Sequence, residues 1–168
     1  FILATSIGIE KFEIRKGQTI MKVMVAGGAG FIGSHLIDAL LAEGDDVVCV
    51  GNFFIGTKDN IAHLHGNPHF KFYEQDLTDL DRMLEIFRAE QVEYVFHLAA
   101  NSDIQASAQS PMIEYKNTYS TTFILLECMR LCGVKKLFFA STSAVYGEQM
   151  GAEVSEETVA LKPSSYYG

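Results

Sequence analysis

Residues 21–38 read MKVMVAGGAGFIGSHLID, and this stretch decides the fold of the chain. The apolar run at 23–26 is typical of a buried strand, glycines follow at once, and an amphipathic run typical of a helix begins at Phe31. A strand, a tight turn and a helix in this order present unpaired N–H groups and the positive end of a helix dipole at the turn. The stretch therefore predicts a site for the pyrophosphate of a dinucleotide.

The glycines of this turn are spaced G-x-x-G-x-x-G, at Gly27, Gly30 and Gly33. We expect Gly27 to reverse the chain without a Cβ clash. Gly30 is expected to let backbone N–H groups approach an anion, and Gly33 to let the helix pack against its strand. These glycines and the intervening Phe31 and Ile32 are the first predicted cofactor-binding residues.

Composition and charge narrow the class of protein. A chain of 168 residues with 48% hydrophobic and 20% charged residues is long enough to form one globular domain. Its net charge of −8 lacks the basic face that nucleic acid or an anionic membrane surface requires. No apolar run reaches the roughly 18 residues of a membrane span, and the apolar residues 1–9 lack the flanks of a signal peptide. We therefore predict a cytoplasmic protein without nucleic-acid or membrane partners.

The cysteines and histidines do not indicate a metal site. We interpret the cysteines as small core residues because they lack metal-ligand spacing; they are Cys49, Cys128 and Cys132. Three histidines share a polar stretch, and we favour a solvated loop over a metal site because no acidic or cysteine partner completes a ligand set; they are His63, His65 and His69.

Apolar strands alternate with helical patterns from residue 21 onward. Strands rich in Val, Leu and Phe without alternation are buried on both faces, and strands separated by helices pair in parallel through right-handed crossovers. We predict an α/β fold with a doubly wound parallel sheet, the Rossmann fold. The expected strands are 22–26, 46–50, 70–74, 93–98 and 135–140, and the expected helices are 31–43, 57–64, 79–90 with Thr78 as N-cap, and 111–132.

Three further motifs accompany the glycine turn: H-x-A-A at 97–100, V-Y-G at 145–147, and Tyr-Gly at 167–168. Together they resemble the extended short-chain dehydrogenase/reductase family, the NAD-dependent epimerases and dehydratases of nucleotide sugars. The resemblance covers residues 21–168 and is strongest to the 4-epimerases of UDP-hexoses.

The resemblance also implies how the chain is divided. Residues 1–20 lie outside it, and Met21 stands where family proteins start, so we expect an N-terminal extension followed by an NAD(P)-binding domain at 21–168. Five strands of the sheet are present. The family's later strands and its sugar-binding C-terminal lobe would follow Gly168, so we expect the domain to be incomplete at this end.

The resemblance implies two catalytic residues. The hydroxyl four residues before the tyrosine of V-Y-G is the family's catalytic Ser/Thr, here Thr142, and the alternative is a strand-end turn capped by its own hydroxyls. Tyr167 is the expected base rather than Tyr166, because Gly168 follows it. A free phenol titrates near about pH 10, so such a base requires nearby positive charge. The family's lysine lies four residues on and would fall beyond Gly168.

The end of the second strand bears on the choice between NAD and NADP. Gly51 stands where related sequences carry the Asp that binds the adenosine ribose, and Asn52 is the remaining candidate for that contact. Without the acid a 2′-phosphate is not repelled, and Lys58 lies nearby. We predict NAD as the cofactor because no arginine follows the strand, and keep NADP as the alternative.

Other cofactor contacts are implied after the third and fourth strands. Asp76–Leu77 resembles the family pair that holds the adenine, and the alternative is that Asp76 caps the next helix. His97 is interpreted as structural. Asn117 matches a family residue beside the cofactor, its alternative being a polar residue on a helix face. The remaining expected contacts are Leu98, Ala99, Ala100, Ser102 and Tyr167.

The resemblance implies transient oxidation at C4 of a UDP-hexose, with Tyr167 as base and return of the hydride to the other face. A decarboxylase or dehydratase of the same family is one alternative; a 4,6-dehydratase carries Asp-Glu directly after its catalytic Thr, where this chain has Ser143–Ala144. The second alternative is a non-catalytic dinucleotide-binding redox sensor. The intact Thr142 and Tyr167 disfavour it, because a sensor needs no proton relay. We expect a homodimer in the whole protein and no activity from residues 1–168 alone.

Overall fold

The computed structural model describes residues 20–149, 151, 154–155, 157 and 161–168. Except for Ile20, the expected N-terminal extension lies outside these residues. In the described part of the chain, parallel strands form one sheet in the order β3-β2-β1-β4-β5. The strands are β1 (Lys22–Ala26), β2 (Asp46–Gly51), β3 (Phe70–Glu74), β4 (Tyr94–His97) and β5 (Lys136–Phe139).

The strand order confirms the doubly wound Rossmann fold. From β1 the chain moves outward through β2 to β3, then returns to the other side of β1 for β4 and β5. The direction of winding therefore reverses between β1 and β4. In an open parallel sheet, the carboxyl ends of the strands at this reversal form the crevice in which ligands bind.

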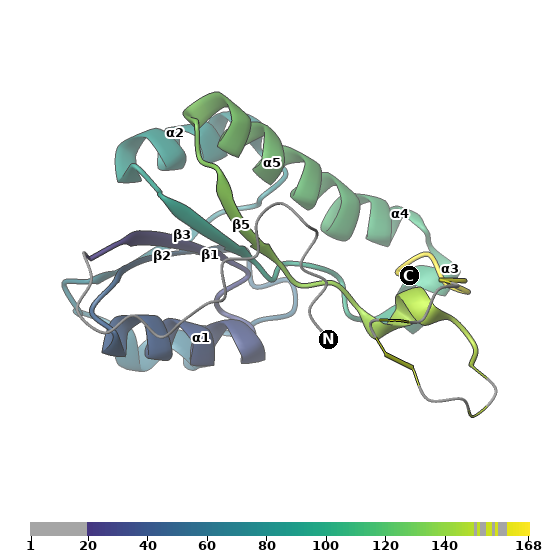
Figure 1. Cartoon of the computed structure of the whole chain (residues 1–168). Helices are drawn as coiled ribbons and strands as arrows, with labels where there is room; N and C mark the ends of the chain where they lie inside the picture. Colours follow the sequence, from purple (N-terminus) through teal and green to yellow (C-terminus); the bar gives the residue numbers. More distant parts are fainter. Residues whose placement is uncertain (1–19, 150, 152–153, 156, 158–160) are drawn as a thin grey trace.

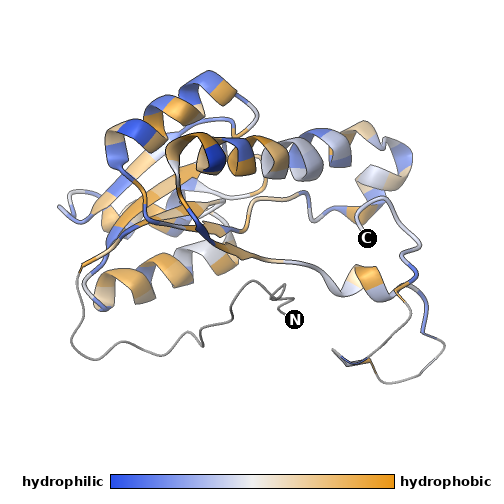
Figure 2. Ribbon diagram, turned by 45° about the horizontal axis from the view of Figure 1, so that its top comes forward, coloured by the Kyte–Doolittle hydropathy of each residue, from blue (hydrophilic) through white to orange (hydrophobic). Residues whose placement is uncertain are grey.

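Helices cover both faces of the sheet (Figure 1). Helix α1 (Phe31–Ala42) lies on one face, and α2 (Leu80–Glu90) and α5 (Thr121–Cys132) lie on the other. The 3₁₀ segment η1 (Lys58–Leu64) packs on the same side as α1. The strands run as an apolar layer through the middle of the molecule (Figure 2).

Alternate residues of the central strand β1 pack into two separate hydrophobic cores, one on each face of the sheet. Val23 and Val25 pack with Ile37 and Leu40 of α1, whereas Met24 and Ala26 pack with residues of α2 and α5. These strand residues are fully buried. Burial on both faces explains why β1 and β2 carry no alternation of apolar and polar residues. The edge strands β3 and β5 differ from the prediction, because none of their residues is fully buried.

The glycine turn is a crowded part of the backbone. Gly27 has φ +81°, and its N–H donates to the carbonyl of Val50 at 2.8 Å. A Cβ on Gly27 would lie 2.7 Å from the backbone nitrogen of Ala99, and one on Gly33 would lie 2.6 Å from Gly27 O and from the Cα of Gly28. Gly33 therefore packs the helix against the turn itself, and not against the strand as predicted.

The expected helices at 31–43, 57–64 and 79–90 each differ by one residue from the observed α1, η1 and α2, and two differences have a physical cause. The N-cap of α2 is Asp79, whose side chain accepts from the N–H of Arg82 at 3.1 Å; the predicted cap, Thr78, instead donates its hydroxyl to Asp76 at 2.7 Å. A short helix, α3 (Ile104–Gln109), was not predicted. Its N-cap is Asp103, whose side chain accepts from the N–H of Ala106.

The expected long helix at 111–132 has a different winding in its middle. It begins as α4 (Met112–Glu114), continues as a π-helical segment η2 (Tyr115–Ser120) and ends as α5. A π-helical turn inside a helix is rare and frequently accompanies a functional site. Apolar periodicity does not distinguish a π turn from an α turn, so the sequence pattern did not reveal it.

We predict that Gly33→Ala lowers the free energy of unfolding by about 2 kcal/mol or more, because the new methyl group overlaps the glycine turn. In an unobstructed helix the same change stabilises by about 0.5–1 kcal/mol, so the sign is diagnostic. Gly51→Ala is the matched control, since a Cβ there meets nothing within 4 Å. Urea denaturation of both variants measures the effect, and an unchanged or raised midpoint for Gly33→Ala contradicts the packing described.

Candidate functional site

A pocket of about 400 Å³ lies at the carboxyl ends of β1, β2 and β4, where the winding reverses. Its walls come from segments far apart in the chain. They are the glycine turn with the start of α1, the loop 51–56, the pair 76–77, the segment 98–102, the helical residues Asn117 and Thr121, and Ala140, Ser141 and Tyr167.

The structure brings together every residue that the sequence predicted to contact a cofactor. All of them line this pocket: Gly27, Gly30, Phe31, Ile32, Gly33, Asn52, Asp76, Leu77, Leu98, Ala99, Ala100, Ser102, Asn117 and Tyr167. The predicted catalytic Thr142 is not among the lining residues, and its neighbour Ser141 is. The structure thus gathers the predicted cofactor-binding residues at one place.

The N-terminus of α1 opens into this pocket without a side-chain cap. Gly30 is the N-cap and carries no side chain, and the first turn of the helix contains no acidic residue. The first intrahelical hydrogen bond runs from the N–H of Ser34 to Gly30 O at 3.0 Å. The N–H of Gly30 donates to Gly27 O at 3.1 Å. The N–H groups of residues 31–33 have no partner within the helix and, together with the helix dipole, favour an anion.

The loop after β2 folds onto the glycine turn and forms a wall that sequence reasoning missed. The carbonyl of Ala29 accepts from the N–H of Thr57 at 3.1 Å and from the side-chain amide of Asn60 at 2.8 Å. A Cβ on Gly56 would lie 2.5 Å from the same carbonyl oxygen. The signal available in the sequence was the apolar run Phe53–Ile55 directly before Gly56, which is unusual for a solvated loop.

Asp76 and Asn52 provide polar groups at the end of the pocket beside β2 and β3. One carboxylate oxygen of Asp76 accepts from the N–H of Thr78 at 2.9 Å and from its hydroxyl at 2.7 Å. Burial opposes ionisation of Asp76, but these hydrogen bonds and the nearby charge of Lys116 lower its pKa. The alternative role as a helix cap falls to Asp79 instead.

Both ends of the Asn52 side chain are also engaged. Its carbonyl oxygen accepts from the N–H of Phe54 at 3.1 Å. Its amide nitrogen donates to Asp76, where it helps to lower the pKa of that carboxyl, and the second N–H of the amide is left to donate toward the pocket. Asn52 thus fits a ribose hydroxyl as a donor, in contrast to the acceptor that an Asp on the strand would provide.

A buried polar network fixes the wall on the β4 side. Asn101 is 1% exposed and donates its amide to Glu114 at 2.6 Å, and Glu114 also accepts from the hydroxyl of Thr118 at 2.6 Å. The same threonine hydroxyl accepts from the N–H of Asn101 at 3.0 Å. This network joins the loop that carries Ser102 to the helical segment that carries Asn117.

His97 is held in the core and does not line the pocket. The hydroxyl of Thr122 donates to Thr118 O at 2.7 Å, so it must accept from Nε2 of His97, which lies 2.8 Å away. The ring is therefore neutral with its proton on Nε2, and Nδ1 has no partner in the described part of the chain. Burial lowers the pKa of His97 to about 4, in agreement with the structural role predicted for it.

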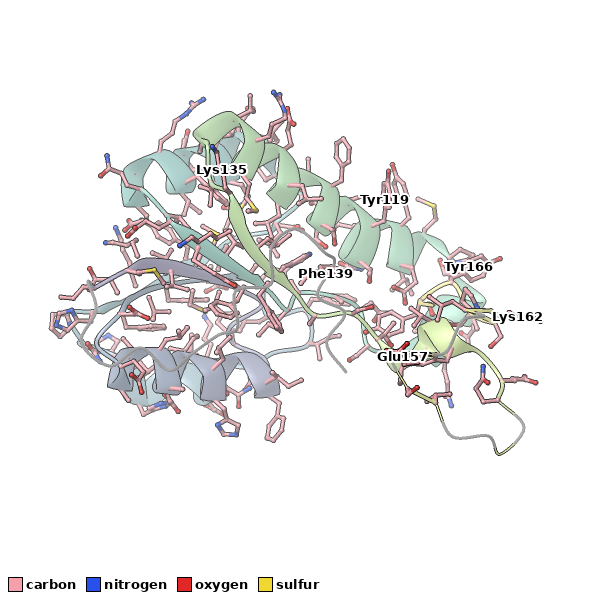
Figure 3. The ribbon with its side chains drawn as sticks, in the orientation of Figure 1. Tyr119, Lys135, Phe139, Glu157, Lys162 and Tyr166 are labelled. Atoms are coloured by element: carbon pink, nitrogen blue, oxygen red, sulfur yellow. The ribbon has the colours of Figure 1, made fainter. Side chains whose placement is uncertain are left out.

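The two tyrosines near the C-terminus have different environments. Tyr167 is half-buried and lines the pocket, whereas Tyr166 is 66% exposed and lies at the outer end of the molecule (Figure 3). A Cβ on Gly168 would lie 2.6 Å from Ala144 O, so the chain end packs closely against η3 (Ser143–Tyr146). The structure thus brings Tyr167, and not Tyr166, to the pocket.

Thr142 acts as the N-cap of η3. Its hydroxyl oxygen accepts from the N–H of Ala144 at 3.1 Å, which is the capping role considered as its alternative. The hydroxyl hydrogen is still free to be donated in this geometry. Capping therefore fixes the position of the oxygen without using its donor.

The described residues contain no cluster of three or more ligating side chains that could hold a metal ion. His63 pairs with Asp38 and His69 with Asp46, each at 2.8 Å. Cys49 and Cys128 are buried and free, as expected for core residues, and burial raises the pKa of Cys49 to about 12. No helix within these residues is long and apolar enough to cross a membrane.

The sheet order and the glycine turn at its switch point define a nucleotide-binding domain of the Rossmann class. The family described as GDP-mannose 4,6 dehydratase matches residues 24–168, and the chain belongs to this family of NAD-dependent epimerases and dehydratases.

Curated relatives of the chain have two activities in their names. The chain is 35% identical to a UDP-glucose 4-epimerase of Lacticaseibacillus casei, covering 88% of the chain and 43% of that protein. It is 34% identical to UDP-glucuronic acid decarboxylase 1 of Arabidopsis thaliana, covering 80% of the chain and 29% of that protein. The chain therefore spans less than half the length of these relatives.

A solved structure with the same fold contains the cofactor. The UDP-glucose 4-epimerase of Thermus thermophilus, in complex with NAD, superimposes with a TM-score of 0.79 at 37% identity. The match covers 88% of this chain and 46% of that one. The likeness extends to the fold and supports a cofactor of the NAD type.

The buried neutral His97 predicts a pH dependence of stability. Between about pH 6.5 and pH 4 the unfolded chain binds a proton at this residue that the folded chain excludes, so the free energy of unfolding falls as the pH is lowered. The loss reaches about 3 kcal/mol across this range. Urea titrations at several pH values test this: His97→Gln should flatten the slope, and the exposed His65→Gln should not. Equal slopes in all three proteins contradict the assignment.

Proposed function

We propose that the whole protein is an NAD-dependent nucleotide-sugar epimerase that acts at C4 of a UDP-hexose. The observation that carries the proposal is that one pocket contains both an uncapped helix N-terminus and the phenol of Tyr167. The first group fits a pyrophosphate and the second fits a proton acceptor. The relatives named as UDP-glucose 4-epimerases support this choice of reaction.

The lining residues match the chemical groups of NAD. The N–H groups at residues 31–33 would hold the pyrophosphate, and the N-cap Gly30 has no side chain that would compete for them. Asp76 would accept from the adenine amine while Leu77 packs on the ring, and Asn52 would donate to the ribose. The rest of the dinucleotide would lie along Leu98, Ala99, Ala100, Ser102 and Asn117.

The chemistry requires one proton acceptor and one oriented hydroxyl. Bound NAD supplies the acceptor of the C4 hydride and later its donor. Tyr167 takes the proton of the C4 hydroxyl as the C4–O bond becomes a carbonyl, and returns it when the hydride comes back to the other face. Thr142 donates its free hydroxyl hydrogen to the same substrate oxygen and orients it.

The relatives leave a decarboxylase as the second candidate within the family. A 4,6-dehydratase is less favoured despite the description of the family, because Ser143 and Ala144 offer no acid or base beside Thr142. A redox sensor needs no proton acceptor at the pocket, so the position of Tyr167 argues against it. The cytoplasmic location stays a prediction from the sequence.

We also propose that the whole protein forms a homodimer through the outer face of η2 and α5. Tyr115, Tyr119 and Phe123 are 55%, 60% and 57% exposed. Their rings stack in a row, with centroids 5.6 and 6.3 Å apart, and Tyr119 points away from the sheet (Figure 3). Such a row of exposed aromatic rings is typical of a protein–protein interface, and the same helix of a second copy would cover it.

Tyr167→Phe in the whole protein should reduce turnover of UDP-galactose by about 10²–10⁴-fold, because it removes the general base and leaves the ring in place. NAD affinity should change little. Tyr166→Phe is the matched control and should retain activity, since that residue is exposed and outside the pocket. Steady-state rates and cofactor titration measure the two effects. A larger loss in Tyr166→Phe would contradict the choice of base.

Tyr119→Lys should convert the dimer of the whole protein to a monomer at micromolar concentration, because it places a charge in the middle of the aromatic row. Leu131→Lys is the control: it is also exposed on α5 but lies about two helical turns beyond Phe123, the last ring of the row. Sedimentation velocity distinguishes the two. A dimer that survives Tyr119→Lys, or one that Leu131→Lys dissociates equally, overturns this interface.

A further inference from the structure

We propose that Glu74, held by Lys58, is the carboxylate that makes the pocket select NAD over NADP, in place of the acid that is absent at Gly51. The inference rests on the proposed function, because it concerns the adenosine end of the same pocket. It assigns a specificity-determining role to a residue of β3 that does not itself line the pocket.

The sheet register places Glu74 beside the position of the absent side chain. Gly51 is the last residue of β2, and its partner in the parallel ladder is Glu74, the last residue of β3. Partner residues of neighbouring strands project from the same face of the sheet. On this face Cys49 and Phe72, two residues earlier on each strand, pack in the core beneath α1. The side chain of Glu74 therefore leaves the sheet on the face where an acid at 51 would.

Glycine at 51 leaves space next to this carboxylate. A Cβ built on Gly51 meets nothing within 4 Å, and its φ is not in the left-handed region. Neither sterics nor backbone conformation requires a glycine at this position. The space beside Glu74 that an Asp side chain at 51 would fill is thus open.

Lys58 holds Glu74 and is in turn held by a wall of the pocket. Its Nζ lies 3.0 Å from a carboxylate oxygen of Glu74 and 5.2 Å from the centre of the Phe53 ring, which lines the pocket. The lysine closest along the chain to the predicted ribose site is thereby neutralised. It offers no surplus positive charge to a 2′-phosphate.

The second lysine at this end is also paired. Nζ of Lys116 lies 3.6 Å from Asp76, whose pKa is lowered in part by that charge. Residues 51–74 contain no arginine. Each of these two lysines is therefore paired with one carboxylate, and removal of either carboxylate would free a positive charge for a dianionic phosphate.

The ion pair affects ligand selection more than stability. Its partners are 72% and 57% exposed, and exposed pairs contribute little to folding. Glu74→Gln should therefore fold normally while releasing the charge of Lys58. We expect it to strengthen NADP binding by about tenfold at low salt and to change NAD binding by less than about twofold, with the gain shrinking at high salt.

The experiment measures dissociation constants of NAD and NADP for the whole protein by calorimetry, for the wild type and four variants. Glu74→Gln is the test variant. In the double variant Lys58→Met and Glu74→Gln, the lysine whose charge was released is also removed, so the gain in NADP affinity should disappear. Glu85→Gln, which breaks the exposed pair with Arg82 on α2, is the matched control and should leave both constants unchanged. The double variant Gly51→Asp and Glu74→Gln should bind NADP no better than the wild type, because the acid at 51 replaces the negative charge lost at 74.

The outcomes separate this inference from the proposed function. Failure of the wild type to bind either dinucleotide refutes the proposed function itself. NAD binding with an NADP-to-NAD ratio that Glu74→Gln leaves unchanged, or that Glu85→Gln changes equally, overturns only the role of Glu74. A gain for NADP that persists without Lys58 also contradicts the proposal, because it would not depend on the released charge.

Discussion

The close approach of the glycine turn to α1 and to the segment after β4 is the contact on which the rest of the structure depends. A Cβ on Gly27 would meet the backbone at Ala99, and one on Gly33 would meet the turn at Gly27 and Gly28. The turn and the start of α1, which are adjacent in sequence, therefore meet the distant segment after β4 at backbone distance. Their meeting holds the uncapped start of α1 at the switch point of the sheet, where the pocket forms.

Two buried polar networks complete this arrangement. One joins Asn101 to Glu114 and Thr118, and the other joins His97 to Thr122. Both tie the end of β4 to the helical segment that follows it. Because buried polar groups are costly without partners, these contacts define one position for the wall that carries Ser102 and Asn117. The turn provides the anion site and the networks provide the opposite wall.

The sequence was sufficient for the fold and for most of the pocket, for physical reasons. Strands buried on both faces read as continuous apolar runs, and the glycines at 27 and 33 are required because a Cβ at either would overlap the backbone. The loop wall at 53–56 was missed because it depends on hydrogen bonds to Ala29 across the chain. The π-helical turn at η2 was missed because six residues are too few for hydrophobic periodicity to distinguish its winding from that of an α-helix.

The local capping choices were the least predictable part. Thr78 and Asp79 are both good N-caps by residue type, and the choice of Asp79 depends on Asp76 engaging the threonine. Thr142 lies outside the pocket wall, while Ser141 lines it, because the strand ends in a capped turn there. Such one-residue choices depend on competing hydrogen bonds that the sequence pattern does not rank.

The central claim is that the uncapped start of α1 binds the pyrophosphate of a dinucleotide. A titration of the isotope-labelled protein with NAD, followed by the backbone amide signals in NMR, tests it most directly. The account predicts that the largest shifts occur at residues 30–33, with further shifts at 98–102, and that adenosine alone leaves residues 30–33 unchanged. Shifts confined to segments outside the pocket, or none at residues 30–33 when NAD is bound, would contradict it.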